Sequence, residues 1–173
     1  MHQKKVKKLA FSAMFCALIF AMTWISFPAP VLGNVNLGDG MLLLCAWSLG
    51  GPWAAVAAAT GAALTDLLGA YAIYAPGTFL IKAAMAAVAA ISLRLFSHCK
   101  IPAAVARILS AILAEAVMIL GYFLYEALIL SYGFPSAALN IPFNAAQGMI
   151  AILLSGLAFP LIQKLGLLRW LES

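Results

Sequence analysis

The strongest constraint on this chain is a succession of apolar runs separated by glycine and proline. A helix that crosses a membrane needs about 20 predominantly apolar residues, and runs that approach or exceed this length follow one another along the sequence. The predicted helices cover residues 9–27, 39–50, 52–68, 76–96, 103–131 and 143–168. The sequence therefore predicts an all-α membrane protein, a bundle of six transmembrane helices that forms a single integral membrane domain over residues 1–173.

The second predicted run, residues 39–50, is too short to cross a membrane alone. A helix over these residues reaches about 18 Å, against about 30 Å of hydrocarbon. Either this crossing begins in the preceding segment, or that segment dips into the membrane. In the sixth run, Pro160 is expected to kink the helix, because proline removes a backbone donor.

Composition excludes several classes of protein. Hydrophobic residues make up 66% of the chain and charged residues only 9%, whereas soluble domains are about 45–50% apolar and about 25% charged. So few charges cannot cover a water-soluble globule, which excludes a nucleic-acid-binding domain, a secreted folded enzyme and a disordered chain. The three cysteines and two histidines are scattered, so no disulfide framework, metal site or cofactor is expected.

Lysine and arginine predict the orientation of the crossings. With six crossings, the connections 28–38, 69–75 and 132–142 share one side and contain no cation. The opposite side carries Lys4, Lys5, Lys7, Lys8, Arg94, Lys100, Arg107, Lys164 and Arg169. The positive-inside rule then places both termini in the cytoplasm and the protein in the cell membrane. The N-terminal lysines can also attract anionic lipid, but fixing the topology is the simpler interpretation.

A cleaved signal peptide is the alternative interpretation of the basic start, with a cleavage site near residues 31–33. The apolar run that follows the lysines is longer than the usual core of a signal peptide, and prolines crowd the site. Both features favour a retained first helix.

Lys82, the remaining cation, lies inside a predicted crossing, roughly 9 Å below its outer end. A charge at this depth requires a partner or a water-filled cavity. Acidic, amide and aromatic side chains occur at similar depth on four other segments, with Trp24, Tyr71 and Tyr125 in positions that interface belts also use. The predicted solute-binding residues are Asp39, Asp66, Tyr74, Lys82, Tyr122, Glu126, Asn140, Asn144 and Gln147.

This set has two interpretations. It is typical of a small-molecule pocket, in which a few polar groups lie in an apolar, aromatic cleft open to the outside. Alternatively, Asp66 and Lys82 form a buried ion pair and the amides join neighbouring helices. Convergence from separate helices favours the pocket. Glu115 lies near mid-depth, and three roles are open for it: a deep pocket residue, a helix-joining group or a proton site.

Alanines at regular spacing form one face on each of two predicted helices. Ala13, Ala17 and Ala21 recur every four residues on the first run, as Ala54, Ala58 and Ala62 do on the third. Such faces let helices approach closely, and packing within the bundle explains them on its own.

The sequence contains no phosphate loop, no H-E-x-x-H and no nucleophile elbow, so enzymatic activity is not expected.

Four blocks between residues 35 and 85 resemble the substrate-binding S components of energy-coupling factor (ECF) vitamin transporters, most closely the riboflavin-type group. They are VNLGD at 35–39, LGGP at 49–52, GAALTDLLG at 61–69 and YAPGTFLIK at 74–82. The resemblance implies a subunit of the bacterial plasma membrane that binds a vitamin from outside. It also implies a transmembrane coupling protein and two cytoplasmic ATPases as partners, with Ala13, Ala17 and Ala21 docking the coupling protein.

The expected solute is a flat heterocycle of the riboflavin, pyridoxine or hydroxymethylpyrimidine type. Lys82, Asp66 and Asn144 are expected to hold its polar groups, and the segment 28–38 to act as a gate. An excess of acids over Lys82 in the outer cluster disfavours a multiply anionic solute. Two rivals remain open: a stand-alone secondary transporter driven by protons through Glu115 or Glu126, and a membrane scaffold without transport activity.

Overall fold

The computed structural model, which describes residues 2–28 and 34–166, is a helical bundle with one small hairpin. In these ranges six helices have eleven residues or more: α1 His2–Trp24, α2 Gly38–Ser48, α3 Gly51–Leu68, α4 Ala75–His98, α5 Ala103–Leu124 and α7 Ile141–Lys164. The shorter elements are the strands β1 Ser26–Pro28 and β2 Asn34–Asn36, the 3₁₀ turn η1 Ala72–Tyr74, the π turn η2 Tyr125–Ile129 and the helix α6 Phe134–Ala138.

Four stretches within the described residues are long and apolar enough to cross a membrane: Lys5–Trp24, Ala72–His98, Ala103–Ile129 and Phe134–Lys164. α3 has 18 residues and a length of about 27 Å, but its glycines, threonines and Asp66 dilute its hydrophobicity. The all-helical membrane fold expected from the sequence is confirmed, whereas its orientation across the membrane stays a prediction.

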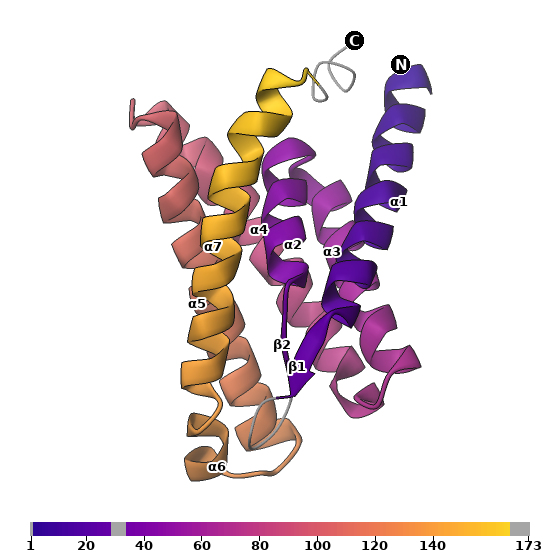
Figure 1. Ribbon diagram of the computed structural model, residues 1–173, viewed down its shortest axis with the longest axis vertical. Helices are drawn as coiled ribbons and strands as arrows, with labels where there is room; N and C mark the ends of the chain where they lie inside the picture. The colour runs from indigo at the N-terminus through magenta and orange to yellow at the C-terminus, as the bar shows by residue number, and fades with distance from the viewer. Residues whose placement is uncertain (1, 29–33, 167–173) are drawn as a thin grey trace.

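A β-hairpin precedes the short helix α2. α2 has 11 residues, which reach only about 16 Å. Before it, β1 and β2 pair antiparallel, with Ser26 opposite Asn36, and β2 leads into α2 (Figure 1). Of the two alternatives left by the sequence, the structure shows the preceding segment entering the bundle in non-helical form. Within the expected gate 28–38, residues 29–33 lie outside the described residues.

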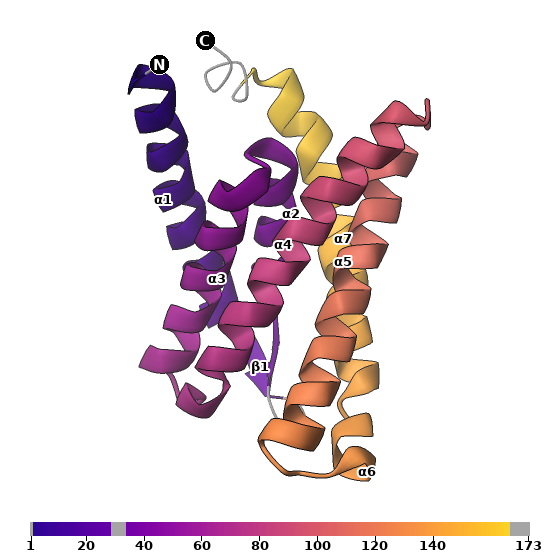
Figure 2. The same ribbon diagram turned by 180° about the vertical axis from the view of Figure 1, so that it is seen from behind.

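The connections that carry cations gather at one end of the bundle. The start of α1, the α4–α5 connection and the end of α7 lie at the upper end in Figures 1 and 2. The β1–β2 hairpin, η1 and α6 occupy the opposite half. We call these the cationic end and the hairpin end. This arrangement is the one that the positive-inside pattern predicts for helices of alternating direction; Arg169 lies outside the described residues.

The two alanine faces have different surroundings. Ala54, Ala58 and Ala62 on α3 are fully buried in the bundle core. By contrast, the face formed by Ala13, Ala17 and Ala21 on α1 is exposed. Packing within the bundle therefore accounts for the face on α3 and leaves the face on α1 without a neighbour among the described residues.

Close approach of α1 and α3 depends on Gly61, which yields a stability prediction. A methyl group at Gly61 would lie 2.5 Å from the Cys16 carbonyl oxygen and 3.1 Å from Cβ of Ile19. Gly61→Ala is therefore expected to lower the free energy of unfolding by about 1–3 kcal/mol through overpacking, measured by denaturant unfolding in detergent. Gly156→Ala is the control, because a methyl group there has no neighbour within 4 Å. Equal stability of the two variants would contradict the prediction.

Candidate functional site

A polar hollow lies in the half of the bundle nearer the hairpin end. The space between its lining side chains is about 450 Å³, a figure that includes open solvent at its mouth. Side chains from β2, α3, η1, α4, α5, η2 and α7 surround it. They are Asn34, Asn36, Asp66, Tyr74, Thr78, Tyr122, Glu126, Asn140, Phe143, Asn144 and Gln147. Residues far apart in the sequence therefore share one cavity.

Helical periodicity explains how α7 contributes several of these groups. Asn140 immediately precedes the helix, and Asn144 and Gln147 follow after four and three residues. This spacing places all three on one face. Across the hollow, Asp66 lies in the last turn of α3, and Thr78 lies in the first turn of α4. The ends of helices at the hairpin end thus supply the polar lining.

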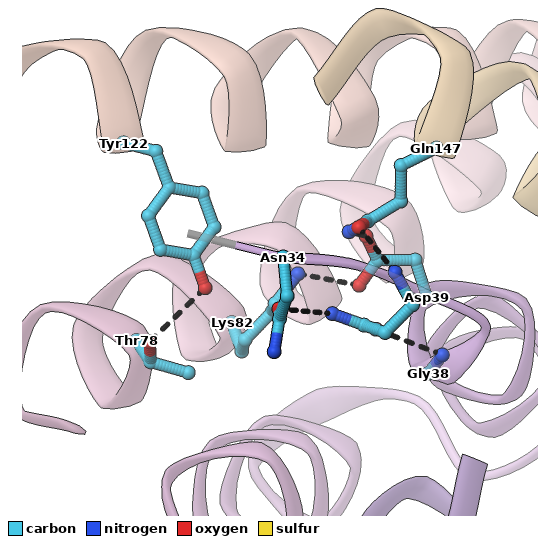
Figure 3. A network of polar contacts seen from close by, with 8 residues as sticks. Asn34, Gly38, Asp39, Thr78, Lys82, Tyr122 and Gln147 are labelled. Carbon is cyan, nitrogen blue, oxygen red and sulfur yellow. Dashed lines mark hydrogen bonds and ion pairs between the residues drawn. The ribbon is translucent and has the colours of Figure 1, made fainter. Parts of the chain in front are cut away.

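A buried polar network, which reaches the lining of the hollow through Asn36 and Gln147, lies beside it (Figure 3). The Lys82 ammonium group makes an ion pair with Asp39 Oδ1 at 2.5 Å. Asp39 Oδ2 accepts a hydrogen bond from Gln147 Nε2, and Gln147 Oε1 accepts one from the backbone N–H of Asn36 at 2.8 Å. Asn36 Oδ1 in turn accepts a hydrogen bond from the N–H of Gly38, in the first turn of α2. The network joins α4, α2, α7 and the hairpin.

The partner of Lys82 is a correction to the sequence analysis. An ion pair of Lys82 with Asp66 was one interpretation there, whereas the carboxylate bound to Lys82 is that of Asp39. Because the hairpin enters the bundle, Asp39 starts α2 in the interior, where only 1% of its surface is exposed. The Lys82 ammonium group also lies 5.4 Å from the centre of the Tyr122 ring. Neither Lys82 nor Asp39 lines the hollow, which they adjoin through Gln147.

A second group of hydrogen bonds surrounds Glu126 in η2. The Tyr74 hydroxyl donates to Glu126 Oε1 at 3.3 Å, and Asn140 Nδ2 donates to Glu126 Oε2 at 2.9 Å. Nearby, the hydroxyls of Thr78 and Tyr122 lie 3.0 Å apart. Both carboxylate oxygens of Glu126 are therefore engaged, and this group fixes the positions of the Tyr74 ring and the Asn140 amide.

Two buried acceptors on the hollow have no hydrogen-bond partner among the described residues. They are Asp66 Oδ2 and Asn140 Oδ1. Buried polar atoms in native proteins are nearly always hydrogen-bonded, so an orphaned pair in one cavity indicates a place for a ligand or water. A molecule in the hollow that satisfies both atoms must offer N–H or O–H donors.

A second hollow adjoins the first on the side of α1. It is lined by Trp24, Ser26, Asn34, Thr65, Asp66, Gly69, Ala70 and Tyr71 and has about 440 Å³ of space, again partly open. Asn34 and Asp66 belong to both linings and separate the two spaces. Asp66, although buried, therefore lies between the two spaces.

Seven of the nine predicted site residues line the first hollow; Asp39 and Lys82 lie in the adjoining network. Tyr125 does not line it, and its hydroxyl donates to the Ile73 carbonyl group. Sequence reasoning missed Asn34, Asn36, Thr78 and Phe143 as lining residues. Asn34 and Asn36 could have been predicted from the alternating Asn-Val-Asn of β2, because alternation places both amides on one side of a strand.

Glu115 is buried on α5 away from the lining of the hollow. Neither of its carboxylate oxygens has a hydrogen-bond partner among the described residues. The side chain lies against Gly148, where a methyl group would approach Oε2 to 3.1 Å. Its role as a pocket residue, a helix-joining group or a proton site stays a hypothesis. In the described part of the chain, no group of three or more His, Cys, Asp or Glu residues is placed to hold a metal ion.

Comparison with known proteins identifies a family and a related fold. The family model described as "ECF-type riboflavin transporter, S component" matches residues 3–165. A solved structure described as "Structure and mechanism of the S component of a bacterial ECF transporter" has the same fold, with a TM-score of 0.73. The two chains are 23% identical, and the alignment covers 93% of this chain and 98% of that one. No curated protein matches this sequence.

Proposed function

The chain belongs to the ECF-type riboflavin transporter S component family, and on this premise we propose that it binds riboflavin or a related vitamin heterocycle for uptake into the cell. S components are the substrate-binding subunits of such transporters and not catalytic enzymes. The solute would enter from the hairpin end and occupy the polar hollow. ATP would be hydrolysed by partner subunits.

The observation that carries this proposal is the pair of orphaned acceptors on the hollow. Asp66 Oδ2 and Asn140 Oδ1 are buried and lack donors within the described residues. A heterocycle with ring N–H groups or hydroxyls supplies such donors. The Asn144 amide lines the same space and makes no side-chain hydrogen bond within the described residues, so it offers a further donor and acceptor.

Aromatic side chains favour a flat solute. Tyr74, Tyr122 and Phe143 line the hollow from η1, α5 and α7. Tyr74 is held by its bond to Glu126, and the Tyr122 hydroxyl lies next to that of Thr78. Rings fixed in this way offer faces for stacking at little cost in conformational entropy. The two acids in the lining, Asp66 and Glu126, disfavour a multiply anionic molecule.

Lys82 and Asp39 do not line the hollow, but their network would hold in place residues that do. Gln147 lines the hollow, but both ends of its amide are already bonded, to Asp39 and to Asn36. Lys82 holds Asp39 by the ion pair. We therefore assign direct contact with the solute to Asp66, Asn140 and Asn144, and a supporting role to Gln147, Lys82 and Asp39.

The distribution of cations supports the direction of transport. The cationic end would face the cytoplasm with both termini, and the hollow would then open toward the outside. The protein would then lie in the plasma membrane, with its binding site on the side from which nutrients arrive.

The exposed alanine face of α1 is proposed to dock the coupling protein, and this yields a prediction. Ala13, Ala17 and Ala21 leave a smooth surface that another membrane helix can approach closely. Ala17→Trp is expected to weaken assembly with the coupling protein and ATPases on the order of tenfold, because the large ring separates the helices. Riboflavin binding by the isolated subunit should not change.

Assembly is measured by co-purification of the coexpressed complex. Ile112→Trp on α5 is the matched control, because Ile112 is also exposed on a spanning helix, with 48% of its surface accessible. If Ala17→Trp assembles as well as Ile112→Trp, the docking assignment is wrong.

The solute is tested by binding to the purified protein. Riboflavin, pyridoxine and a hydroxymethylpyrimidine are titrated separately, with flavin fluorescence for the first and calorimetry for the others. We expect saturable binding of one heterocycle at one site per chain. If none binds, the proposed function fails. Uptake into vesicles that contain only this chain and a pH gradient would instead support a proton-driven transporter. The candidate group is then Glu115, whose carboxylate has no hydrogen-bond partner among the described residues.

A further inference from the structure

A third cavity lies between α5 and α7, in the half of the bundle nearer the cationic end. It is a groove with about 620 Å³ of partly open space, lined by Ala104, Arg107, Ile108, Ile152, Leu153, Gly156, Leu157 and Pro160. Most of its walls are apolar. Leu153 and Leu157 expose 65% and 72% of their surfaces, so the groove faces the lipid side of the helices. An occupant of this surface must be largely apolar.

Arg107 is the one charged residue in this lining. Its guanidinium carbon lies 5.1 Å from the centre of the Phe159 ring. Phe159 is buried and meets the Trp47 ring edge-on at 5.5 Å, so the surface beneath Arg107 is fixed. Among residues 2–28 and 34–166, Arg107 forms no ion pair with a carboxylate. It is therefore an oriented cation with its charge available at the edge of an apolar groove.

On the α7 side, the groove is open at Gly156, and a second cation, Lys164, follows further along the helix. Lys164 follows Pro160 by four residues, and Pro160 follows Gly156 by four, so the three lie along one helix face. Lys164 does not line the groove, but it lies about one turn beyond Pro160 toward the cationic end. A methyl group at Gly156 would meet nothing within 4 Å, which shows that the groove is open there. Because proline has no N–H, the Gly156 carbonyl group also lacks its usual helical donor.

We propose that this groove binds an anionic phospholipid. The phosphate group would lie against the Arg107 guanidinium, whose planar donors match phosphate oxygens, with Lys164 nearby. One acyl chain would follow the apolar walls past Ile108, Leu153 and Leu157. Basic pockets between membrane helices on the cytoplasmic side commonly recognise such headgroups. The groove is separate from the polar hollow, so this inference does not depend on the identity of the solute.

The test uses purified full-length protein and native mass spectrometry. Phosphatidylglycerol and phosphatidylcholine with identical acyl chains are added in equal amounts. The wild-type protein is expected to retain phosphatidylglycerol about tenfold more than phosphatidylcholine. Arg107→Gln should bring this preference close to one, whereas Arg107→Lys should keep part of it. Gly156→Leu, which fills the groove, should lower retention of both lipids.

Arg94→Gln is the matched control, because Arg94 is an exposed cation near the same end but outside the groove. It should keep the preference for phosphatidylglycerol. Thermal unfolding of each variant shows whether the fold is intact. The proposal is overturned if Arg107→Gln and Arg94→Gln have the same lipid preference. It is also overturned if Arg107→Gln leaves lipid retention unchanged but prevents assembly with partner subunits, since the groove would then be a protein interface.

Discussion

Replacing Lys82 with methionine is expected to lower the free energy of unfolding by about 3–5 kcal/mol. The change leaves the Asp39 carboxylate without its counter-ion, in a site where only 1% of the residue is exposed. Asp39 also anchors Gln147, and Gln147 accepts the backbone bond from Asn36. Loss of the ion pair therefore disturbs the start of α2 and the base of the hairpin together. Denaturant unfolding in detergent, followed by circular dichroism, measures the effect.

The double variant Lys82→Met/Asp39→Asn separates the cost of leaving a charge unpaired from the cost of losing the packing of the Lys82 side chain. With both charges removed, most of the stability should return, because a neutral amide at position 39 can still accept the bond from Gln147. Lys100→Met, at an exposed position, is the control for removing a cation. A Lys82→Met protein as stable as Lys100→Met would contradict the ion pair.

The membrane fold was predictable because its physical signal is strong and local. Apolar runs of sufficient length have few alternatives to crossing a membrane as helices. The positions of cations such as Arg94 and Lys164 predict which helix ends lie together, and Figure 1 shows these connections at one end. No long-range contact had to be known for these conclusions.

The partner of Lys82 was not predictable in this way. Lys82 and Asp39 are 43 positions apart, and their contact depends on how deeply the β1–β2 hairpin enters the bundle. Hydropathy does not report this depth, since the hairpin strands have only three residues each. From the sequence alone, Asp39 could equally lie at the membrane surface, and Asp66 would then be a reasonable partner for Lys82. The structure differs because α2 begins in the interior.

The candidate site was predictable where helical spacing determines it. Asn140, Asn144 and Gln147 share a face of α7 for geometric reasons alone. Asn34 and Asn36 were missed because they belong to a strand within a segment expected to be a loop. Thr78 was missed because a threonine in an apolar run more often bonds to its own helix than lines a cavity.

Asp66 is the residue on which binding of the solute should depend most. It lines both hollows, and its Oδ2 atom is buried without a donor among the described residues. A solute N–H or O–H group that reaches Oδ2 gains a hydrogen bond to a charged acceptor, which contributes about 1.5–3 kcal/mol.

Asp66→Asn is therefore expected to weaken binding of the cognate heterocycle about 10- to 100-fold, since each factor of ten corresponds to about 1.4 kcal/mol. Glu115→Gln is the matched control: it also converts a buried acid to an amide, but Glu115 does not line the hollow. Titration of both purified variants with the solute that binds the wild-type protein gives the comparison. If Asp66→Asn keeps wild-type affinity while Glu115→Gln loses it, the solute lies deeper than the hollow and the assignment of Asp66 is wrong.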